Sequence, residues 1–244
     1  MESTQVNRDF ASAWDKNQGD FAKGIAEDIL TFAANKKIKI KSVMDICCGA
    51  SNLLQVFSNN GLVCYGTESR QGMFEYSKEK CPNVKYFLTE NMYDVPGKQK
   101  VDLITCTHDV VNYFESFDNW ISFFKSVEKH LSRKGMFVFD FYTKNKLKDW
   151  NETTFTSSDW IDCLTSVKSG LYDKTVINYT YYINYQNYMI KTRDIVVESY
   201  FENQTIFDAL AKCGFKKIMI VDKALNPLDN IEFADRIHIV AMKK

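Results

Sequence analysis

The sequence is poor in the residues that build metal sites and disulfide frameworks. Among its 244 residues there are three histidines (His108, His130 and His238) and seven cysteines, which are scattered and form no C-x-x-C pair. This pattern differs from the spaced Cys and His ligands of zinc proteins, so we predict no metal site. The odd number of cysteines, and an N-terminus without a basic n-region and an apolar h-region, indicate a cytoplasmic protein with reduced thiols.

Excess charge and long apolar runs are also missing. Lys plus Arg and Asp plus Glu both number 31, and the pI is about 6.8. This balance argues against a general affinity for nucleic acid or for anionic lipid. No apolar run approaches the length needed to cross a membrane. With 45% hydrophobic and 25% charged residues, the chain has the composition of a globular domain with a substantial core.

Apolar segments alternate with amphipathic ones along most of the chain. This alternation predicts an α/β fold with a largely parallel sheet that is covered by helices on both sides. We predict strands at 42–46, 62–67, 84–88, 101–106, 136–141, 217–221 and 237–242. The helices between them are expected to end near residue 59, and to span 69–80, 119–131 and 203–213. Two further helices, 3–18 and 20–36 with Asp20 as an N-cap, are predicted before the first strand.

A different pattern fills the segment 143–202. Residues 143–170 are polar and read as irregular, with one candidate strand near 160–167. From 172 to 201 the chain alternates in steps of two residues, with a turn expected at 184–187, which predicts a long antiparallel β-hairpin inserted into the α/β domain. The alternation sends about half of its tyrosines to each face. One face should pack on the sheet domain or on a second subunit, which leaves a homodimer open.

The stretch Asp45–Ser51 joins the first predicted strand to the first helix that follows a strand. It is made of small residues around Gly49, and such a turn lets a ligand approach the backbone and the N–H groups of the helix N-terminus. Glu68 ends the second strand, 19 residues after Gly49, at the spacing where a carboxylate can accept both hydroxyls of a ribose. An acid at a helix N-terminus can also be purely structural, and the turn itself can be an ordinary strand-to-helix turn.

These residues together carry a family resemblance. Asp45-Ile-Cys-Cys-Gly49-Ala-Ser51, then Glu68, then Asn91-Met92, and the Lys134-Gly135 turn resemble a class I S-adenosylmethionine-dependent methyltransferase over residues 40–142. The usual first motif of that family is acid-x-Gly-x-Gly-x-Gly. This chain keeps the acid and the middle glycine, with Cys47 and Ser51 where glycines are usual and Asn91 where an aspartate is common.

The resemblance implies a Rossmann-like methyltransferase fold, a seven-stranded sheet with its last strand antiparallel, and S-adenosylmethionine (SAM) as cofactor. It divides the chain into a helical lid (1–40), a SAM-binding domain (41–142 and 203–244) and a β insertion that covers the substrate (143–202). The residues expected to bind the cofactor are Trp14, Asp45, Cys47, Gly49, Glu68, Ser69, Asn91, Met92 and Thr107. The candidate catalytic residues are His108, Asp109 and Tyr142.

Small-molecule N-methyltransferases of the amino-sugar and glycine type are the most similar subgroup, which implies a small-molecule acceptor methylated on nitrogen or oxygen. His108 and Asp109, after the fourth strand, are the best-placed bases, although His108 can also be structural and an amine acceptor of low pKa needs no base. Phe10 and Trp14 can form a lid over the cofactor or belong to the core of their helix.

Three alternatives stay open. A nicotinamide-dependent oxidoreductase also uses a glycine turn and an acid, but the missing glycines count against close backbone approach to a pyrophosphate. A non-catalytic methyltransferase-like SAM-binding protein is the second, although Asp45, Gly49 and Glu68 are retained. A nucleic-acid methyltransferase is the third, and the balanced charge lowers it.

Overall fold

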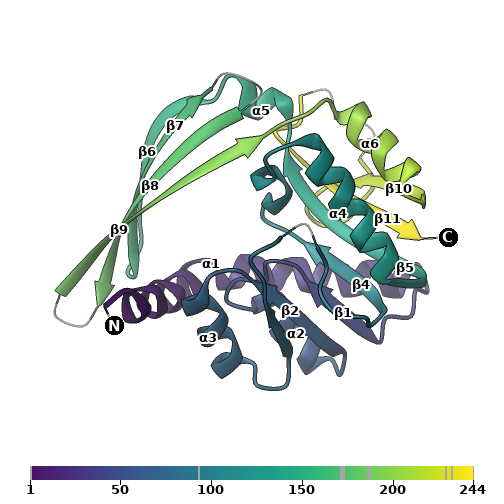
Figure 1. The fold of residues 1–244 in the computed structure, drawn as a ribbon, viewed down its shortest axis with the longest axis horizontal. Coiled ribbons are helices and arrows are strands. Elements are labelled where there is room, and N and C mark those ends of the chain that lie inside the picture. The colour runs from purple at the N-terminus through teal and green to yellow at the C-terminus, as the bar shows by residue number, and fades with distance from the viewer. Residues whose placement is uncertain are drawn as a thin grey trace.

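The computed structural model describes residues 2–92, 94–170, 174–185, 188–228, 230–231 and 233–243. Two sheets organise them (Figure 1). The larger is seven-stranded, in the order β10-β11-β5-β4-β1-β2-β3. Its strands are β1 (Ser42–Asp45), β2 (Val63–Glu68), β3 (Lys85–Leu88), β4 (Val101–Cys106), β5 (Leu131–Tyr142), β10 (Phe215–Val221) and β11 (Arg236–Lys243).

The large sheet is parallel from β3 to β5, and β11 runs antiparallel to both of its neighbours, β5 and β10. The predicted fold class is therefore confirmed, including the antiparallel last strand. The strand order reverses at β1, where β2 and β4 lie on either side. In such sheets ligands bind beyond the carboxyl ends of the strands at this reversal.

Helices cover the two faces of the large sheet. One face carries α1 (Glu2–Asn35), α2 (Asn52–Asn59) and α3 (Gln71–Lys80), and the other carries α4 (Phe117–His130) and α6 (Asn203–Lys212). Each face has its own buried core cluster. The apolar face predicted for α4, with Trp120, Phe123, Phe124 and Val127, is fully buried in the first of these clusters.

The prediction of two N-terminal helices is wrong, because α1 is one continuous helix of 34 residues. Asp20 was expected to cap the second of them. Instead Gly19 faces α2 so closely that a Cβ on it would come within 3.2 Å of Asn52 Oδ1, and Asp20 is an exposed residue of the helix rather than an N-cap. Tertiary packing outweighs the low helix propensity of one glycine, which costs about 1 kcal/mol.

The smaller sheet has four antiparallel strands in the order β6-β7-β8-β9: β6 (Asn151–Ser157), β7 (Ile161–Ser169), β8 (Lys174–Tyr185) and β9 (Tyr188–Ser199). Figure 1 shows it extending away from the large sheet, above the N-terminal part of α1. The hairpin β8–β9 and the candidate strand near 160–167, which is β7, agree with the prediction, whereas the expectation that the rest of 143–170 is irregular is wrong, because it contains α5 (Lys144–Lys148) and β6. Strand β6 is exposed at all seven residues, so no apolar alternation marked it in the sequence. The turn expected at 184–187 falls in part outside the described residues.

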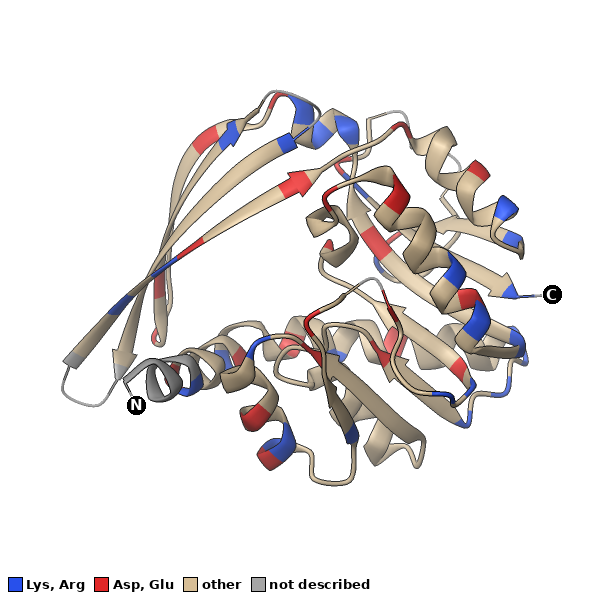
Figure 2. Ribbon diagram, in the orientation of Figure 1, with Lys and Arg blue, Asp and Glu red and all other residues tan. Residues whose placement is uncertain are grey.

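Basic and acidic residues are interspersed over the helices and both sheets (Figure 2). None of the helices in the described part of the chain has the length and apolar character needed to cross a membrane. Across the same residues, no cluster of three or more His, Cys, Asp or Glu side chains could hold a metal ion.

Candidate functional site

A cavity of about 310 Å³ lies at the carboxyl ends of β1, β2 and β4. Its floor is the turn after β1, and its walls come from α1, the residues after β2 and β4, and the inner face of β8 and β9. Nine residues that were predicted from the sequence as cofactor or catalytic residues line it: Trp14, Asp45, Cys47, Gly49, Glu68, Ser69, Met92, Thr107 and His108. The strand-order reversal therefore coincides with a cavity, as the topology requires.

The turn after β1 is held by left-handed backbone at Cys47 (φ 54°), Gly49 (φ 52°) and Ser51 (φ 60°). This conformation costs an L-residue about 1–2 kcal/mol, so Cys47 and Ser51 need local support. Thr67 of β2 supplies it by accepting hydrogen bonds from the backbone N–H groups of Cys47 (3.0 Å, at its Oγ1) and Cys48 (2.8 Å, at its carbonyl). The side-chain hydroxyl of Ser51 accepts from Tyr86 (2.9 Å).

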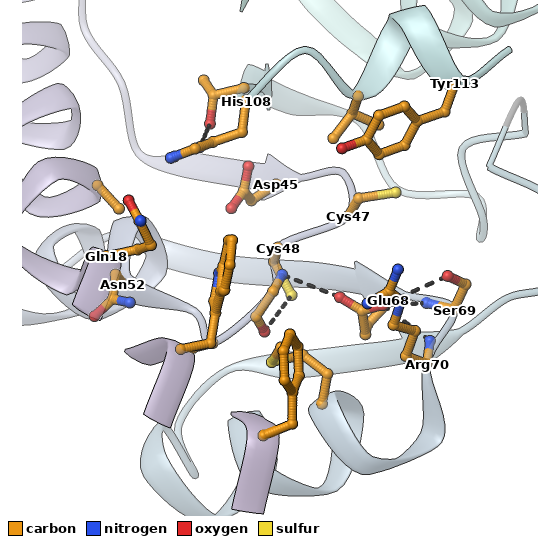
Figure 3. A pocket seen from close by; sticks show the side chains of 18 of the residues that line it. Gln18, Asp45, Cys47, Cys48, Asn52, Glu68, Ser69, Arg70, His108 and Tyr113 are labelled. Atoms are coloured by element: carbon orange, nitrogen blue, oxygen red, sulfur yellow. Dashed lines mark hydrogen bonds between the residues drawn. The ribbon is translucent and has the colours of Figure 1, made fainter. Parts of the chain in front are cut away.

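Glu68 organises the wall beside this turn. Its carboxylate accepts three backbone hydrogen bonds, from Gly49 (3.1 Å), Ser69 (2.8 Å) and Arg70 (2.9 Å), and the residue is only 6% exposed (Figure 3). The same side chain thus fixes the β1 turn and presents a carboxylate to the cavity. Each carboxylate oxygen has further lone pairs for a ligand hydroxyl.

Asp45 stands at the floor of the cavity with 3% of its surface exposed. One of its carboxylate oxygens accepts a hydrogen bond from Thr105 Oγ1 (2.6 Å). Burial raises the pKa of Asp45 to about 7, and the nearby Glu68 adds to the rise while the Thr105 bond opposes it. A cationic group in the cavity would favour the ionised form of this carboxyl.

His108 follows β4 and reaches the opposite side of the cavity from Glu68 (Figure 3). It and the next residue, Asp109, both have positive φ (65° and 52°), and Asp140 holds this turn by accepting both of their backbone N–H groups (3.1 and 2.6 Å). Burial, followed by the charges of Arg236 and His238, lowers the pKa of His108 to about 4. Its imidazole is therefore neutral at pH 7, with Nδ1 3.4 Å from Thr107 Oγ1, and a neutral imidazole has one nitrogen that accepts and one that donates.

Comparison with known proteins identifies the family. A family model described as a methyltransferase domain matches residues 18–218, which is most of the chain. The chain belongs to the methyltransferase domain family. YqeM of Bacillus subtilis (strain 168), provisionally named a methyltransferase, is 23% identical over 121 residues. That match covers 48% of this chain, and the chain spans about half (49%) of the length of this curated relative.

Solved structures of methyltransferases share the fold over nearly the whole chain. A SAM-dependent methyltransferase from Clostridium acetobutylicum ATCC 824 superposes with a TM-score of 0.82 at 20% identity, covering 96% of this chain and 97% of the other. Streptomyces venezuelae DesVI gives 0.79 at 15% identity, covering 96% and 98%. The sugar N-methyltransferase KedS8 from Streptoalloteichus sp ATCC 53650 gives 0.75 at 14% identity, covering 95% and 91%. The methyltransferase thus has the class I, Rossmann-like fold of these proteins.

Three residues that were predicted for the site do not line the cavity of this methyltransferase. Asp109 is buried in an ion pair with Arg236, and Tyr142 packs its ring on the same guanidinium, 4.4 Å from it. Asn91 is exposed, and its side-chain amide donates to Asp94 (3.0 Å). Because none of the three lines the cavity, their roles in the site remain predictions.

Aromatic side chains from α1, the small sheet and the segment after β4 line the cavity. Phe10 and Trp14 of α1 stack on each other, and both make T-shaped contacts with Tyr181, at centroid distances of 5.1 and 6.2 Å. Tyr113 and Tyr179 also line the cavity. Phe10 and Trp14 therefore line the cavity while they also pack against small core clusters. Of the hairpin tyrosines, Tyr179 and Tyr181 line the cavity, whereas the side chains at 185 and 188 lie outside the description.

The sequence analysis did not single out several residues of the cavity. Gln18 is one helical turn after Trp14, a spacing that could have revealed it. Asp194 and Val196 of β9 both face the cavity, because alternate residues of a strand point to the same side. The sequence gives the alternation, but only the pairing with β8 shows which set of residues points into the cavity. Arg70 reaches across to Asp194 in a 2.5 Å ion pair that joins the α3 side of the cavity to the small sheet.

Proposed function

We propose that this methyltransferase uses S-adenosylmethionine to methylate a small-molecule acceptor on nitrogen or oxygen. The observation that carries the proposal is the pairing of Gly49 with Glu68 beside Asp45, at the strand ends that flank the sheet reversal. A neighbour by fold is named as a sugar N-methyltransferase, which agrees with a small acceptor. A cavity of about 310 Å³ suits small ligands rather than a polymer.

The residues of the cavity fit this cofactor. The Glu68 carboxylate, already aligned by three backbone N–H groups, would accept the ribose hydroxyls, as a buried carboxylate with spare lone pairs can. Asp45, at the floor, would balance the amino group of the methionine part, and the aromatic pair Phe10 and Trp14 would tolerate a sulfonium nearby. When bound, SAM supplies an electrophilic methyl group on a positively charged sulfur.

Positioning is the main contribution of the protein to such a transfer, because in-line displacement at a methyl carbon needs little covalent assistance. The two aromatic residues of α1 and the tyrosines of the small sheet, which line the cavity, would limit the access of water and the space left for the acceptor. His108, neutral at pH 7, would accept a proton or hydrogen bond from the acceptor at a ring nitrogen. Its low pKa makes it a weak base, which suits an acceptor that loses its proton readily.

The lid role of residues 1–40 and the substrate-cover role of residues 143–202 belong to the same proposal. Both are supported by the cavity lining, since Phe10, Trp14 and Gln18 come from α1 and Tyr179, Tyr181 and Asp194 come from the small sheet. A cytoplasmic location and a homodimer stay predictions.

The test is calorimetry of the purified protein with SAM, S-adenosylhomocysteine (SAH) and NAD, followed by a methyl-transfer screen over amines, amino sugars, alcohols and peptides. We expect both sulfur compounds to bind and NAD not to. Binding of NAD alone would favour an oxidoreductase and sink the proposal. Binding of SAM without methyl transfer to any acceptor in the screen would favour the non-catalytic alternative.

A further inference from the structure

Glu198 of β9 is a buried carboxyl group without a partner. Its exposed fraction is 0%, and neither of its two carboxyl oxygens has a hydrogen-bond partner among the described residues. Removing an ionised carboxylate from water costs several kcal/mol unless hydrogen bonds or a counter-charge compensate for it. Buried polar groups that stay unpaired are rare and call for an explanation such as a missing ligand or ion.

The strand places this carboxyl next to the part of β9 that lines the cavity. Asp194 and Val196 both line the cavity, and Glu198 continues the same face of β9 by the two-residue alternation. The backbone around Glu198 is fixed, since Asn112 donates to the Ser199 carbonyl (2.9 Å) and the Ser199 hydroxyl donates to the Phe114 carbonyl (2.6 Å). The position of Glu198 is therefore built into the fold and is not a loop conformation.

The charge of Glu198 acts on three tyrosine hydroxyl groups: those of Tyr113 after β4, Tyr142 at the end of β5 and Tyr179 on β8. Burial first, and then the Glu198 charge, raises the pKa of Tyr142 to about 12 and that of Tyr113 well above its usual value. Tyr179 is raised by burial, by Tyr181 and then by Glu198. Tyr113 and Tyr179 line the cavity, so two of the three phenols that feel the Glu198 charge are within reach of a ligand there.

We propose that Glu198 and the rings of Tyr113 and Tyr179 form a subsite for a cationic amino group of the methyl acceptor, so that this enzyme acts on amines. This rests on the proposed function and narrows its substrate class. Tyrosine faces attract an ammonium group, and a carboxylate behind them supplies the matching charge. A hydroxyl brings no charge that would stabilise the ionised form of Glu198, whereas an ammonium does.

The state of Glu198 before binding supports the same reading. Burial raises its pKa to about 8, so the free protein holds a neutral carboxyl at pH 6.5. An arriving ammonium favours the carboxylate, and Glu198 then releases its proton to the solvent. Amine binding at pH 6.5 should therefore release close to one proton, a readout that a merely structural carboxyl would not give.

The experiment is calorimetry on the SAH-saturated protein at pH 6.5, in two buffers of different ionisation enthalpy. The probes are amine and alcohol pairs of the same skeleton: glucosamine with glucose, and phenethylamine with phenethyl alcohol. We expect at least one amine to bind about 10-fold or more tightly than its alcohol, with proton release. In Glu198→Gln that amine should bind at least about 10-fold more weakly and without proton release, while SAH affinity is unchanged.

Two further variants keep the result readable. Glu202→Gln removes an exposed carboxylate near the end of the same strand, paired with Lys144, and should behave as wild type. Glu198→Asp keeps the charge and should retain part of the amine preference. Unchanged SAH affinity and circular dichroism show that each variant is folded.

The outcomes separate the two proposals. Failure of SAH and SAM to bind would remove the proposed function whatever Glu198 does. If SAH binds but no amine binds, or the alcohols bind as tightly as the amines, or Glu198→Gln keeps amine affinity and proton release, the assignment of Glu198 is wrong and the proposed function still stands.

Discussion

Two buried glutamates, Glu68 in the cavity lining and Glu198 on β9 two residues beyond the lining residue Val196, have opposite surroundings. Glu68 accepts three backbone N–H groups, at 2.8 to 3.1 Å, and closes the turn after β1. Glu198 has no hydrogen-bond partner among the described residues, and burial raises its pKa to about 8. Glu68 therefore has hydrogen-bond donors within the protein before any ligand binds, whereas Glu198 has none among the described residues.

The contrast shows which part of the site is preorganised in this protein. Hydrogen bonds made within the protein orient Glu68 in advance, so a ligand hydroxyl meets a fixed acceptor and costs little reordering. An unpaired buried carboxyl lowers the stability of the free protein, and a ligand that pairs with it recovers that free energy as affinity. Glu68 therefore suits a cofactor common to many enzymes, and Glu198 suits selection of an acceptor.

Removing the Glu68 carboxylate should have the largest effect. Glu68→Ala leaves the N–H groups of Gly49, Ser69 and Arg70 without their acceptor, and a hydrogen bond to a charged group contributes about 1.5–3 kcal/mol. We expect SAH affinity to fall by roughly 1,000-fold, about 4 kcal/mol, in calorimetry. Glu90→Ala, an exposed acid after β3, is the control. SAH binding that survives Glu68→Ala unchanged would contradict the ribose assignment.

The unpaired carboxyl of Glu198 should show itself as a dependence of stability on pH. The pKa of Glu198 is raised in the folded state from 4.5 to about 8, so the folded state binds the extra proton between these values and stability falls as pH rises through them. Glu198→Gln removes this dependence. In urea unfolding, the variant should gain on the order of 2–4 kcal/mol relative to wild type between pH 5 and pH 8. Parallel pH profiles for the two proteins would show that Glu198 is already paired.

His108 offers a sharper test of chemistry against binding. We expect His108→Ala to lower kcat by about 10- to 100-fold, with SAH affinity changed less than threefold, because its ring faces the acceptor space rather than Glu68. Since burial lowers its pKa to about 4, the wild-type rate should show no inflection near pH 6.5 from this residue. Full activity in the variant would move the proton-accepting role to another group or to solvent.

The smallest effect is expected where the two sides of the cavity are joined. The ion pair of Arg70 with Asp194 is largely open to solvent, and exposed pairs contribute less than about 1 kcal/mol. Asp194→Asn should therefore change SAM affinity by less than about fivefold, in a manner that higher salt diminishes. A loss much larger than this would mean that the link holds the cavity closed.

The side of the cavity formed by the β1 turn and Glu68 was largely predictable from sequence because its determinants are local. Asp45, Gly49 and Glu68 sit within one strand–turn–helix–strand unit, and the spacing of Glu68 after Gly49 places it beside the turn in any parallel pairing of β1 with β2. The helix start predicted at Asp20 was wrong for the opposite reason, since the continuation of α1 through Gly19 involves packing against Asn52, a residue of another helix.

The acceptor side depended on partners far along the chain. Asp109 and Tyr142 were candidates because they follow strand ends. In the structure both contact Arg236 of the last strand: Asp109 forms an ion pair with it, and the Tyr142 ring packs on its guanidinium. Glu198 could not be singled out, because strand alternation does not say which face is buried until the register with β8 is known. Local motifs located the cavity, and long-range pairing decided which side chains enter it.

The continuity of α1 restricts how a ligand can reach the cavity. Residues such as Ile25 and Ile29 anchor one half of this helix in the core, and the other half carries Phe10 and Trp14 over the cavity. A continuous helix moves as one unit. Near its middle, Asp15 also binds two residues of α3, Lys80 (2.6 Å) and Tyr76 (2.7 Å). The small sheet is held to this helix by the packing of Phe10 and Trp14 on Tyr181, and to the start of α3 by the ion pair of Arg70 with Asp194, so we expect ligand exchange to require these contacts to open.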